Sequence, residues 1–231
     1  MEINNKLLFK LNKIYYFFFK ERFKKKLNFN FPKKISRLSL INKLIKLNKY
    51  TSYLEIGCDQ NQTFDFLNIK NKVGVDPFSG GTIRKTSDVF FKTNSTKFDI
   101  IFVDGYHEYY QVLRDIENSL KFLNKNGIIL VHDTLPSSLS QQSFPRSKNT
   151  WNGDVWKAIV KLRTVKYCDI VTCKIDHGVS VIRKISNKNL LHLNIHNFKE
   201  ELKFEDFYKN FNNYMRTLNF KETLKYLKKK Y

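Results

Sequence analysis

Glycine, proline, cysteine and arginine are all scarce in this 231-residue chain, which has 8 Gly, 4 Pro, 3 Cys and 8 Arg beside 34 Lys. Cys58, Cys168 and Cys173 lack the spacing of a metal site, and an odd number of cysteines without a secretory signal indicates a reduced, cytoplasmic compartment. The apolar run over residues 14–19 has six residues. It is too short to span a membrane, which takes about 20 apolar residues.

Positive charge is abundant but unevenly placed. Of the net +21, residues 1–50 carry +12, with 14 Lys/Arg against 2 Asp/Glu, whereas residues 51–185 carry +4, with 18 against 14. A basic segment suits nucleic acid, an acidic partner or an anionic membrane surface. Arginine, the better residue for phosphate forks, is scarce, so nucleic acid is the less favoured of these. Aromatic residues beside lysines in "IYYFFFK" favour contact with a membrane surface, such as the inner face of the cell membrane.

Three segments follow from the residue pattern: a basic N-terminal extension over residues 1–35, a domain over residues 36–186, and a basic helical extension over residues 187–231. Ser36 precedes a run of apolar residues at helical spacing, which predicts an amphipathic helix over residues 36–49. Short apolar runs rich in β-branched residues then predict buried strands at residues 53–56, 73–75, 100–103 and 128–131.

Helical patterns alternate with these runs, which predicts a doubly wound α/β sheet, mostly parallel. Apolar residues at helical spacing predict a helix before Gly127, and this glycine is expected to end it. Asp154 is expected to cap a helix beginning at "VWKAIVKLR". Two β-like runs around Asp176, His177 and Gly178 predict a C-terminal antiparallel hairpin. The polar stretch over residues 134–153 is long enough to be a lid or a binding loop.

Polar residues follow all four predicted strands. In a parallel sheet the carboxyl ends of the strands open on one edge, where ligands bind near the point of strand reversal. These residues are therefore expected to converge on one crevice. They are Glu55 and Gly57, Asp76, Asp104 and His107, and His132 and Asp133.

Asp76 indicates a particular ligand. It lies 19 positions after Gly57, close to the spacing at which an acidic residue binds the ribose hydroxyls of a dinucleotide. The turn after Gly57, however, lacks the further glycines that let backbone amides approach a pyrophosphate. Nearby acids such as Glu55 and Asp104 would repel a pyrophosphate but tolerate a sulfonium. S-adenosylmethionine (SAM) is therefore favoured over NAD.

The stretches "YLEIGCDQNQTF", "KVGVDP", "TSDVFF", "FDIIFVDGYHEYYQVLRDIENSLKFLNKNGIILVHDTLP" and "WNGDVWKAIVKLR" together resemble a class I SAM-dependent methyltransferase. They are most similar to bacterial members with D-G-x-H and H-D motifs, a group linked to modification of sugars and glycans. The resemblance implies a Rossmann-like fold, flanked here by helical extensions. It also implies cofactor contacts by Glu55 and Gly57 at the methionine part, Asp76 at the ribose, Ser87 and Asp88 at the adenine, and Asp104 at the sulfonium or amino group. Asp59 and Asn61 stand where many relatives have glycine.

Transfer of a methyl group to a hydroxyl requires a base, and His107 and His132, with Asp133, are the candidate catalytic residues. The resemblance also leaves open a divalent ion such as Mg²⁺ held by Asp104, His132 and Asp133. The alternative for these residues is purely structural hydrogen bonding. Trp151 offers a stacking face for an acceptor, expected to be a sugar, a glycan precursor or another small molecule. Two other functions stay open: a nucleic-acid methyltransferase or binding protein, and a non-catalytic component with a SAM fold.

Overall fold

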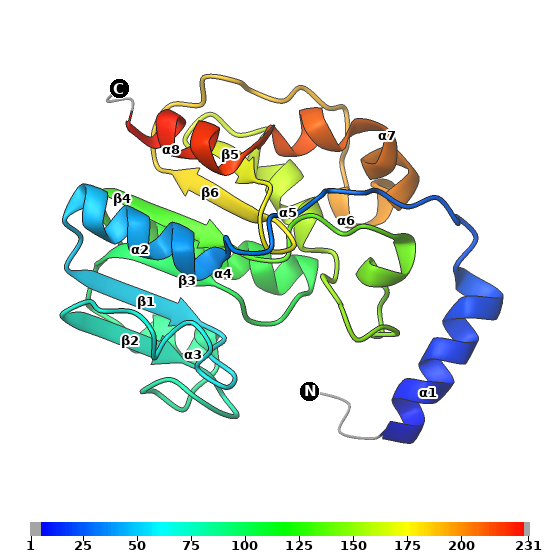
Figure 1. Ribbon diagram of the computed structural model, residues 1–231, viewed down its shortest axis with the longest axis horizontal. Coiled ribbons are helices and arrows are strands. Elements are labelled where there is room, and N and C mark those ends of the chain that lie inside the picture. The colour runs from blue at the N-terminus through cyan, green and yellow to red at the C-terminus, as the bar shows by residue number, and fades with distance from the viewer. Residues whose placement is uncertain (1–5, 229–231) are drawn as a thin grey trace.

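The computed structural model describes residues 6–228; the outermost parts of both predicted extensions, residues 1–5 and 229–231, lie outside this range. A seven-stranded sheet in the order β2-β1-β3-β4-β6-β5-β7 runs through the centre of the molecule (Figure 1). The strands are β1 (Ser52–Ile56), β2 (Asn71–Val75), β3 (Phe98–Val103), β4 (Leu123–Val131), β5 (Asp169–Cys173), β6 (Val179–Arg183) and β7 (Thr217–Leu218).

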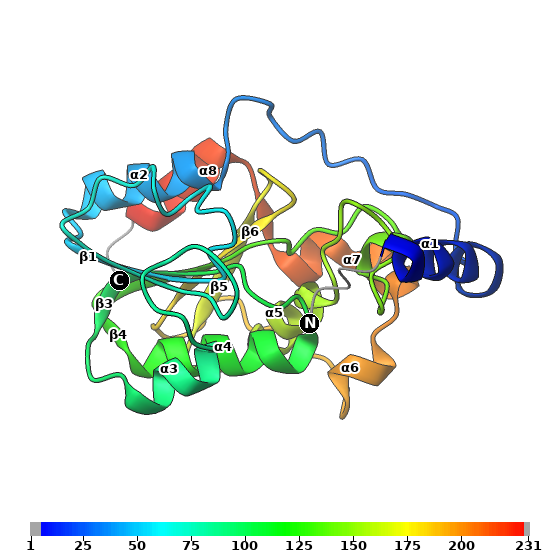
Figure 2. The same ribbon diagram turned by 90° about the horizontal axis from the view of Figure 1, so that it is seen from below.

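Helices cover both faces of the sheet (Figure 2). Their apolar residues form two clusters, one with α2 and α8 on one face, the other with α3, α4, α5 and α7 on the opposite face. The helices are α1 (Lys6–Tyr15), α2 (Arg37–Asn48), α3 (Ser87–Thr93), α4 (Tyr109–Lys121), α5 (Val155–Leu162), α6 (Phe198–Glu201), α7 (Phe204–Met215) and α8 (Phe220–Lys228), with a π-helical turn η1 (Tyr16–Lys20) and a 3-10 turn η2 (Leu139–Gln142).

The predicted fold class is confirmed. All four predicted strands are present and pair in parallel, with β1 between β2 and β3 and β3 beside β4. Residues of β3 are almost all buried, as expected for a strand covered on both faces. The hairpin of β5 and β6 is antiparallel, and Asp176 and His177 in its turn have φ of 43° and 61°. These two left-handed residues lie in the five-residue connection over residues 174–178, where they help the chain to reverse direction.

The prediction for Gly127 is wrong. Gly127 does not end α4, because the helix stops at Lys121 and Gly127 lies inside β4. A Cβ at Gly127 would lie 2.8 Å from the carbonyl oxygen of Asp99 on β3, so the glycine permits a close approach of strands. Residues 59–66, between β1 and β2, form a series of turns rather than a regular helix.

Both extensions contact the domain. In the C-terminal one, Phe204 and Phe207 are fully buried, and β7 adds a parallel strand beside β5, which the sequence pattern did not predict. Asp169 on β5 is fully buried and accepts hydrogen bonds from Arg216 Nη1 at 2.7 Å and Tyr226 Oη at 2.7 Å. This buried carboxylate therefore ties α8 and the end of α7 to the sheet. Across residues 6–228, the structure has no helix that combines the length and the apolar character needed to cross a membrane.

Tyr226→Phe removes one of the two hydrogen bonds to the buried Asp169 carboxylate. We expect the free energy of unfolding to fall by about 1–2 kcal/mol, because a buried acceptor loses a partner. Tyr167→Phe is the matched control, since Tyr167 is 53% exposed. Chemical denaturation of both variants measures the difference, and an equal effect at the two positions would show that the Asp169 contact does not stabilise the fold.

Candidate active site

Gly57 directly follows β1, at the point between β1 and β3 where the chain order of the sheet reverses. Its φ is +85°, and a Cβ there would lie 2.3 Å from the carbonyl oxygen of Asp104. The amide of Gly57 donates to Val75 at the end of β2, and the amide of Asp104 donates to Ile56. The ends of β1, β2 and β3 are thus held together by backbone contacts that only glycine permits at this position.

Asp59 and Asn61 take over the role of the missing glycines in the turn that follows. Their φ values are 43° and 58°, in the left-handed region where Asn and Asp are the most tolerated residues after glycine. The side chain of Asn61 also accepts a hydrogen bond from the amide of Gly81 at 2.7 Å. The loop after β1 is therefore packed against the loop after β2.

Asp76 connects the same two loops. One carboxylate oxygen accepts from the amides of Cys58 and Asp59, both at 3.1 Å, and the other accepts from the amides of Phe78 and Ser79 at 2.8 and 3.0 Å. The predicted ribose-binding carboxylate therefore also fixes the shape of the cofactor loops. Its contact with a ribose stays a prediction.

Ser87 and Asp88, the residues predicted to contact adenine, lie in the first turn of α3. Ser87 Oγ accepts from Gln111 Nε2 of α4 at 3.1 Å, and Asp88 forms an ion pair with Arg114 Nε at 3.7 Å. Both residues therefore join α3 to α4, beside the carboxyl edge of the sheet.

Glu55 lies on β1 with its side chain buried on the face that α2 covers. Its Oε2 accepts from the hydroxyl of Tyr53 at 2.5 Å. Burial raises the pKa of Glu55 to about 8, which the hydrogen bond from Tyr53 only partly opposes, and the charge of Asp104 adds to the rise. Glu55 is therefore neutral at pH 7 in this structure.

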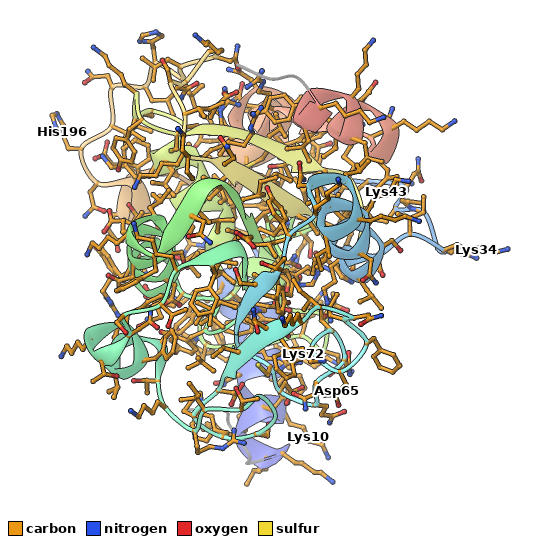
Figure 3. The ribbon with its side chains drawn as sticks, turned by 90° about the vertical axis from the view of Figure 1, so that its left-hand side faces the viewer. Lys10, Lys34, Lys43, Asp65, Lys72 and His196 are labelled. Atoms are coloured by element: carbon orange, nitrogen blue, oxygen red, sulfur yellow. The ribbon has the colours of Figure 1, made fainter. Side chains whose placement is uncertain are left out.

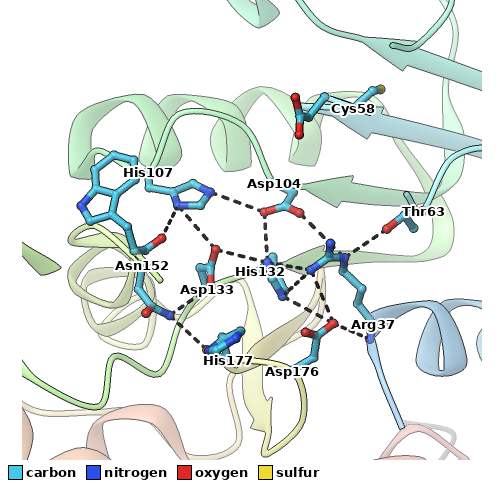
Figure 4. Close-up of polar contacts among 12 residues, drawn as sticks. Arg37, Cys58, Thr63, Asp104, His107, His132, Asp133, Asn152, Asp176 and His177 are labelled. Carbon is cyan, nitrogen blue, oxygen red and sulfur yellow. Dashed lines mark hydrogen bonds and ion pairs between the residues drawn. The ribbon is translucent and has the colours of Figure 1, made fainter. Parts of the chain in front are cut away.

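Four of the predicted site residues meet at the ends of β3 and β4 (Figure 4). His132 Nδ1 lies 3.1 Å from Asp104 Oδ1 and 3.3 Å from Asp133 Oδ2. His107 Nε2 lies 3.5 Å from Asp104 Oδ1, and His107 Nδ1 lies 3.5 Å from Asp133 Oδ2. The two imidazoles thus bridge the same two carboxylates, which confirms that the two strand ends converge; the catalytic roles of these residues stay predictions.

Charge neutralisation dominates the protonation of this cluster. Burial alone would lower the pKa of His132, but the charges of Asp104 and Asp133 raise it well above its usual value. Burial would also lower the pKa of His107. The hydrogen bond to Asp104 and the charge of Asp133 outweigh burial and raise this pKa. Burial would raise the pKa of Asp104, but His132 and His107 hold it well below its usual range.

Two residues of this cluster, Arg37 and Asp176, were not predicted from the sequence. Arg37, at the first turn of α2, places Nη1 3.0 Å from His132 Nε2 and 3.5 Å from Asp176 Oδ2. A guanidinium can only donate, so Arg37 bonds to His132 when Nε2 is unprotonated. A proton on Nε2 would instead face Asp176 Oδ2 at 3.7 Å. Both residues lie far from the D-G-x-H and H-D motifs in sequence, and the one signal for Asp176 was its place in the hairpin turn.

The segment over residues 151–154 forms one wall of the site. Trp151 stacks on His107 with ring centroids 5.2 Å apart, and its carbonyl oxygen lies 3.1 Å from His107 Nδ1. Asn152 Nδ2 donates to Asp133 Oδ1 at 3.0 Å. The prediction that Asp154 caps its own helix with its side chain is wrong, because Asp154 Oδ1 accepts from the amide of Tyr109 at 2.7 Å and so caps α4.

Aromatic side chains continue outward from Trp151. Phe144 packs against Trp151 with ring centroids 6.0 Å apart, and Tyr106 packs edge-on against Phe144 at 5.9 Å. Tyr106 and Phe144 are about half exposed. We call Tyr106, Phe144 and Trp151 the aromatic wall. It extends from the His107 cluster to the surface, where Tyr106 and Phe144 are its exposed members.

The cluster also has the donor set of a divalent metal site. Asp104, His107 and Asp133 each offer a ligand atom, and these atoms all lie within 4.8 Å of one another. Two carboxylates and one imidazole suit a transition ion such as Mn²⁺ or Fe²⁺ better than Mg²⁺, which prefers oxygen ligands. The predicted set named His132 in place of His107; His132 Nδ1 also faces both carboxylates.

Comparison with known proteins gives a family match for the part of the chain that carries this site. Residues 41–134 match a family described as a methyltransferase domain. Among curated proteins, no sequence matches the chain.

Solved structures share the fold at low sequence identity. Cofactor-bound Rv0187 from MTB is similar with a TM-score of 0.51 and 12% identity, over 69% of this chain and 85% of that one. The SAH-bound methyltransferase PaMTH1 of Podospora anserina has a TM-score of 0.47 and 17% identity, over 80% and 97%. The O-methyltransferase TomG of Streptomyces achromogenes, in complex with SAM, has a TM-score of 0.47 and 12% identity, over 65% and 80%.

Gly153→Ala should destabilise the site segment. Gly153 has φ of +58°, and a Cβ there would lie 1.8 Å from the carbonyl oxygen of His107. We expect a loss of more than about 2 kcal/mol in the free energy of unfolding. The backbone strain of alanine at positive φ adds to the overlap of its Cβ with the carbonyl oxygen of His107. Gly105→Ala is the matched control: its Cβ would meet its nearest neighbour at 3.4 Å. Denaturant titration compares the two, and equal stabilities would contradict the contact with His107.

Glu55→Gln should change how stability depends on pH. The pKa of Glu55 rises from 4.5 to about 8 on folding. The contribution of the neutral carboxyl to folding stability is therefore complete below pH 4.5 and is lost as pH rises through 8. Gln cannot ionise but still accepts from Tyr53, so the variant should gain stability relative to wild type between these pH values. Thermal unfolding across this window tests it, with exposed Glu117→Gln as the control; parallel curves for wild type and Glu55→Gln would contradict burial of a neutral Glu55.

Proposed function

We propose that this chain, which carries the methyltransferase domain of a class I SAM-dependent enzyme, transfers the methyl group of SAM to a hydroxyl of a sugar, a glycan precursor or another small acceptor. The observation that carries the proposal is the meeting of Asp104, His107, His132 and Asp133 beside Gly57, at the switch point of the sheet. Ligands of doubly wound sheets bind at this position.

SAM supplies an electrophilic methyl group, and the chain's own residues must orient the acceptor and take its proton. When the acceptor oxygen gains the methyl, the hydroxyl proton leaves to a base. His107 and His132 are the candidate bases, and Asp133 positions them, since its Oδ2 faces both imidazoles and its Oδ1 is fixed by Asn152. His107 and His132 can accept the proton only in their neutral forms, which their raised pKa values disfavour in this structure.

A bound divalent ion would lower the pKa of the acceptor hydroxyl directly. Asp104, Asp133 and His107 are the residues that would hold it. Ligand imidazoles must be unprotonated, so metal affinity should rise with pH.

The aromatic wall supports a ring-shaped acceptor. Ring faces bind the apolar faces of sugars and of aromatic rings by stacking, and Trp151 is fixed against His107 by its stacking contact. An acceptor stacked on Trp151 and Phe144 would therefore present a hydroxyl to the Asp104–Asp133 cluster.

Asp76→Ala should lose affinity for SAM. Removal of the carboxylate deprives the ribose hydroxyls of an acceptor and releases the amides of both cofactor loops, so we expect SAM to bind at least about tenfold more weakly. Asp65→Ala is the control, because Asp65 is an exposed acid in the turn after β1. Calorimetry with SAM and with NAD measures affinity, and Asp76→Asn, which keeps one acceptor oxygen, separates binding from loop collapse.

Wild-type protein should bind SAM and not NAD. No binding of SAM by the wild type, or unchanged binding by Asp76→Ala, would contradict the proposal. Methyl transfer from labelled SAM to a glycan extract, with and without chelator, then tests the acceptor class. Binding of SAM without transfer to any hydroxylated acceptor would instead favour a non-catalytic component.

A further inference from the structure

The N-terminal segment over residues 6–20, formed by α1 and η1, projects from the body of the molecule (Figure 1). It contains no Asp or Glu and four lysines. Phe9, Asn12 and Tyr16 are its partly buried residues. The remaining large apolar side chains are exposed, and Phe18 has 71% of its surface open. They are Leu7, Leu8, Leu11, Ile14, Tyr15, Phe17, Phe18 and Phe19.

Helical spacing gathers most of these side chains on one side of the segment. Leu7, Leu11 and Ile14 follow one another at four and three residues, and Leu8 and Tyr15 lie beside them two turns apart. Elsewhere in the described part of the chain, apart from the pair Tyr106 and Phe144, exposed apolar side chains of this size are scattered, which is ordinary for a folded surface. Five of the eight lie on one face of α1 and the three exposed phenylalanines of η1 follow directly, and apolar exposure of this extent marks a site of interaction.

A cavity of about 840 Å³ lies between this segment and the loop over residues 134–153. Apolar side chains such as Ile14, Phe17 and Phe18 line it together with lysines, among them Lys10 and Lys24. Glu21 is its one acidic lining residue among those that the structure describes. The combination of apolar walls and ammonium groups suits a molecule with an anionic head and an apolar chain.

We propose that residues 6–26 bind the surface of a membrane that contains anionic phospholipids, with the exposed side chains of α1 and η1 entering the apolar layer and the lysines contacting headgroup phosphates. Charge complementarity favours this occupant. Four basic residues follow in the next stretch, Arg22, Lys24, Lys25 and Lys26, and lysines near an anionic bilayer each contribute about 1 kcal/mol. A nucleic acid would use the lysines but leave the eight apolar side chains in water.

The segment is attached to the acceptor side of the active site. Tyr16 Oη donates to the carbonyl oxygen of Leu139 at 3.1 Å, and the amide of Leu27 donates to Ser137 at 2.8 Å. The same loop carries Phe144 and Trp151 of the aromatic wall. Membrane contact through residues 6–26 would therefore bring the mouth of the site to the lipid surface, where acceptors with a lipid anchor lie. The membrane contact itself does not depend on the methyl-transfer function.

Vesicle flotation with the full chain tests the proposal. The wild type should float with vesicles that contain phosphatidylglycerol, and not with phosphatidylcholine alone, and salt should weaken binding. Leu11→Gln with Phe18→Gln should reduce binding by about tenfold or more, because two apolar side chains lose burial. Lys10→Gln with Lys13→Gln should reduce it by about thirtyfold, at about fivefold for each lysine.

Matched pairs elsewhere on the surface are the controls. Lys43→Gln with Lys46→Gln removes the same charge from the exposed side of α2, and Lys10 and Lys43 lie on well-separated parts of the molecule (Figure 3). Phe66→Gln with Tyr167→Gln removes two exposed aromatic side chains. Both pairs should bind vesicles as the wild type does.

Three results would overturn the proposal. Equal loss of binding in the Lys43 pair would mean that net charge alone attracts the protein. Unchanged binding by Leu11→Gln with Phe18→Gln, together with displacement from vesicles by single-stranded RNA, would indicate a nucleic-acid surface. A concentration-dependent dimer in sedimentation velocity that the same pair abolishes would assign the patch to a second copy of the chain.

Discussion

Neutralisation of carboxylates at the carboxyl edge of the sheet is the constraint on which the site depends. Three of them, Asp104, Asp133 and Asp176, come from the ends of β3 and β4 and from the β5–β6 turn, and none can be desolvated without a cationic partner. Arg37 and the two imidazoles supply those partners. This requirement brings α2, β3, β4 and the hairpin to one point, so fold and site are held by the same contacts.

The strands and their order of pairing could be predicted because they rest on local signals. Continuous β-branched runs predict buried strands, and buried strands joined by helices predict a parallel sheet. The end of α4 was not predictable in this way. Gly127 has the residue type of a helix stop, but it serves the close approach of β4 to the carbonyl of Asp99, which only the paired strands reveal.

The scarcity of glycine has a structural explanation in the positions with left-handed backbone. Asn and Asp supply φ of 43° to 63° at Asp59, Asn61, Asn126, Asp133 and Asp176, where many chains would use glycine. Asparagine is abundant in this sequence, and it tolerates that conformation through short local hydrogen bonds. The shortage of glycine after β1 therefore means that Asp and Asn form the turn in its place, and it gives little information about the ligand. The interpretation of that loop as unfit for pyrophosphate therefore loses its backbone argument, and its charge argument is weakened because Glu55 is buried as the neutral acid and Asp104 is paired with two imidazoles.

The site could not be predicted completely, because some of its residues contact partners that are far away in the sequence. Motifs placed Asp104, His107, His132 and Asp133 correctly at one edge, but Arg37 gave no signal because the carboxylates and the imidazole that it contacts are more than 60 positions away. Its presence alters the chemistry. When both imidazoles are protonated, the two of them and Arg37 balance the three carboxylates. One divalent ion with two neutral imidazoles gives the same balance, so this charge arrangement accommodates either two protons or one metal ion. In the second state His107 would hold the ion, and His132 would be the neutral imidazole that can accept a proton.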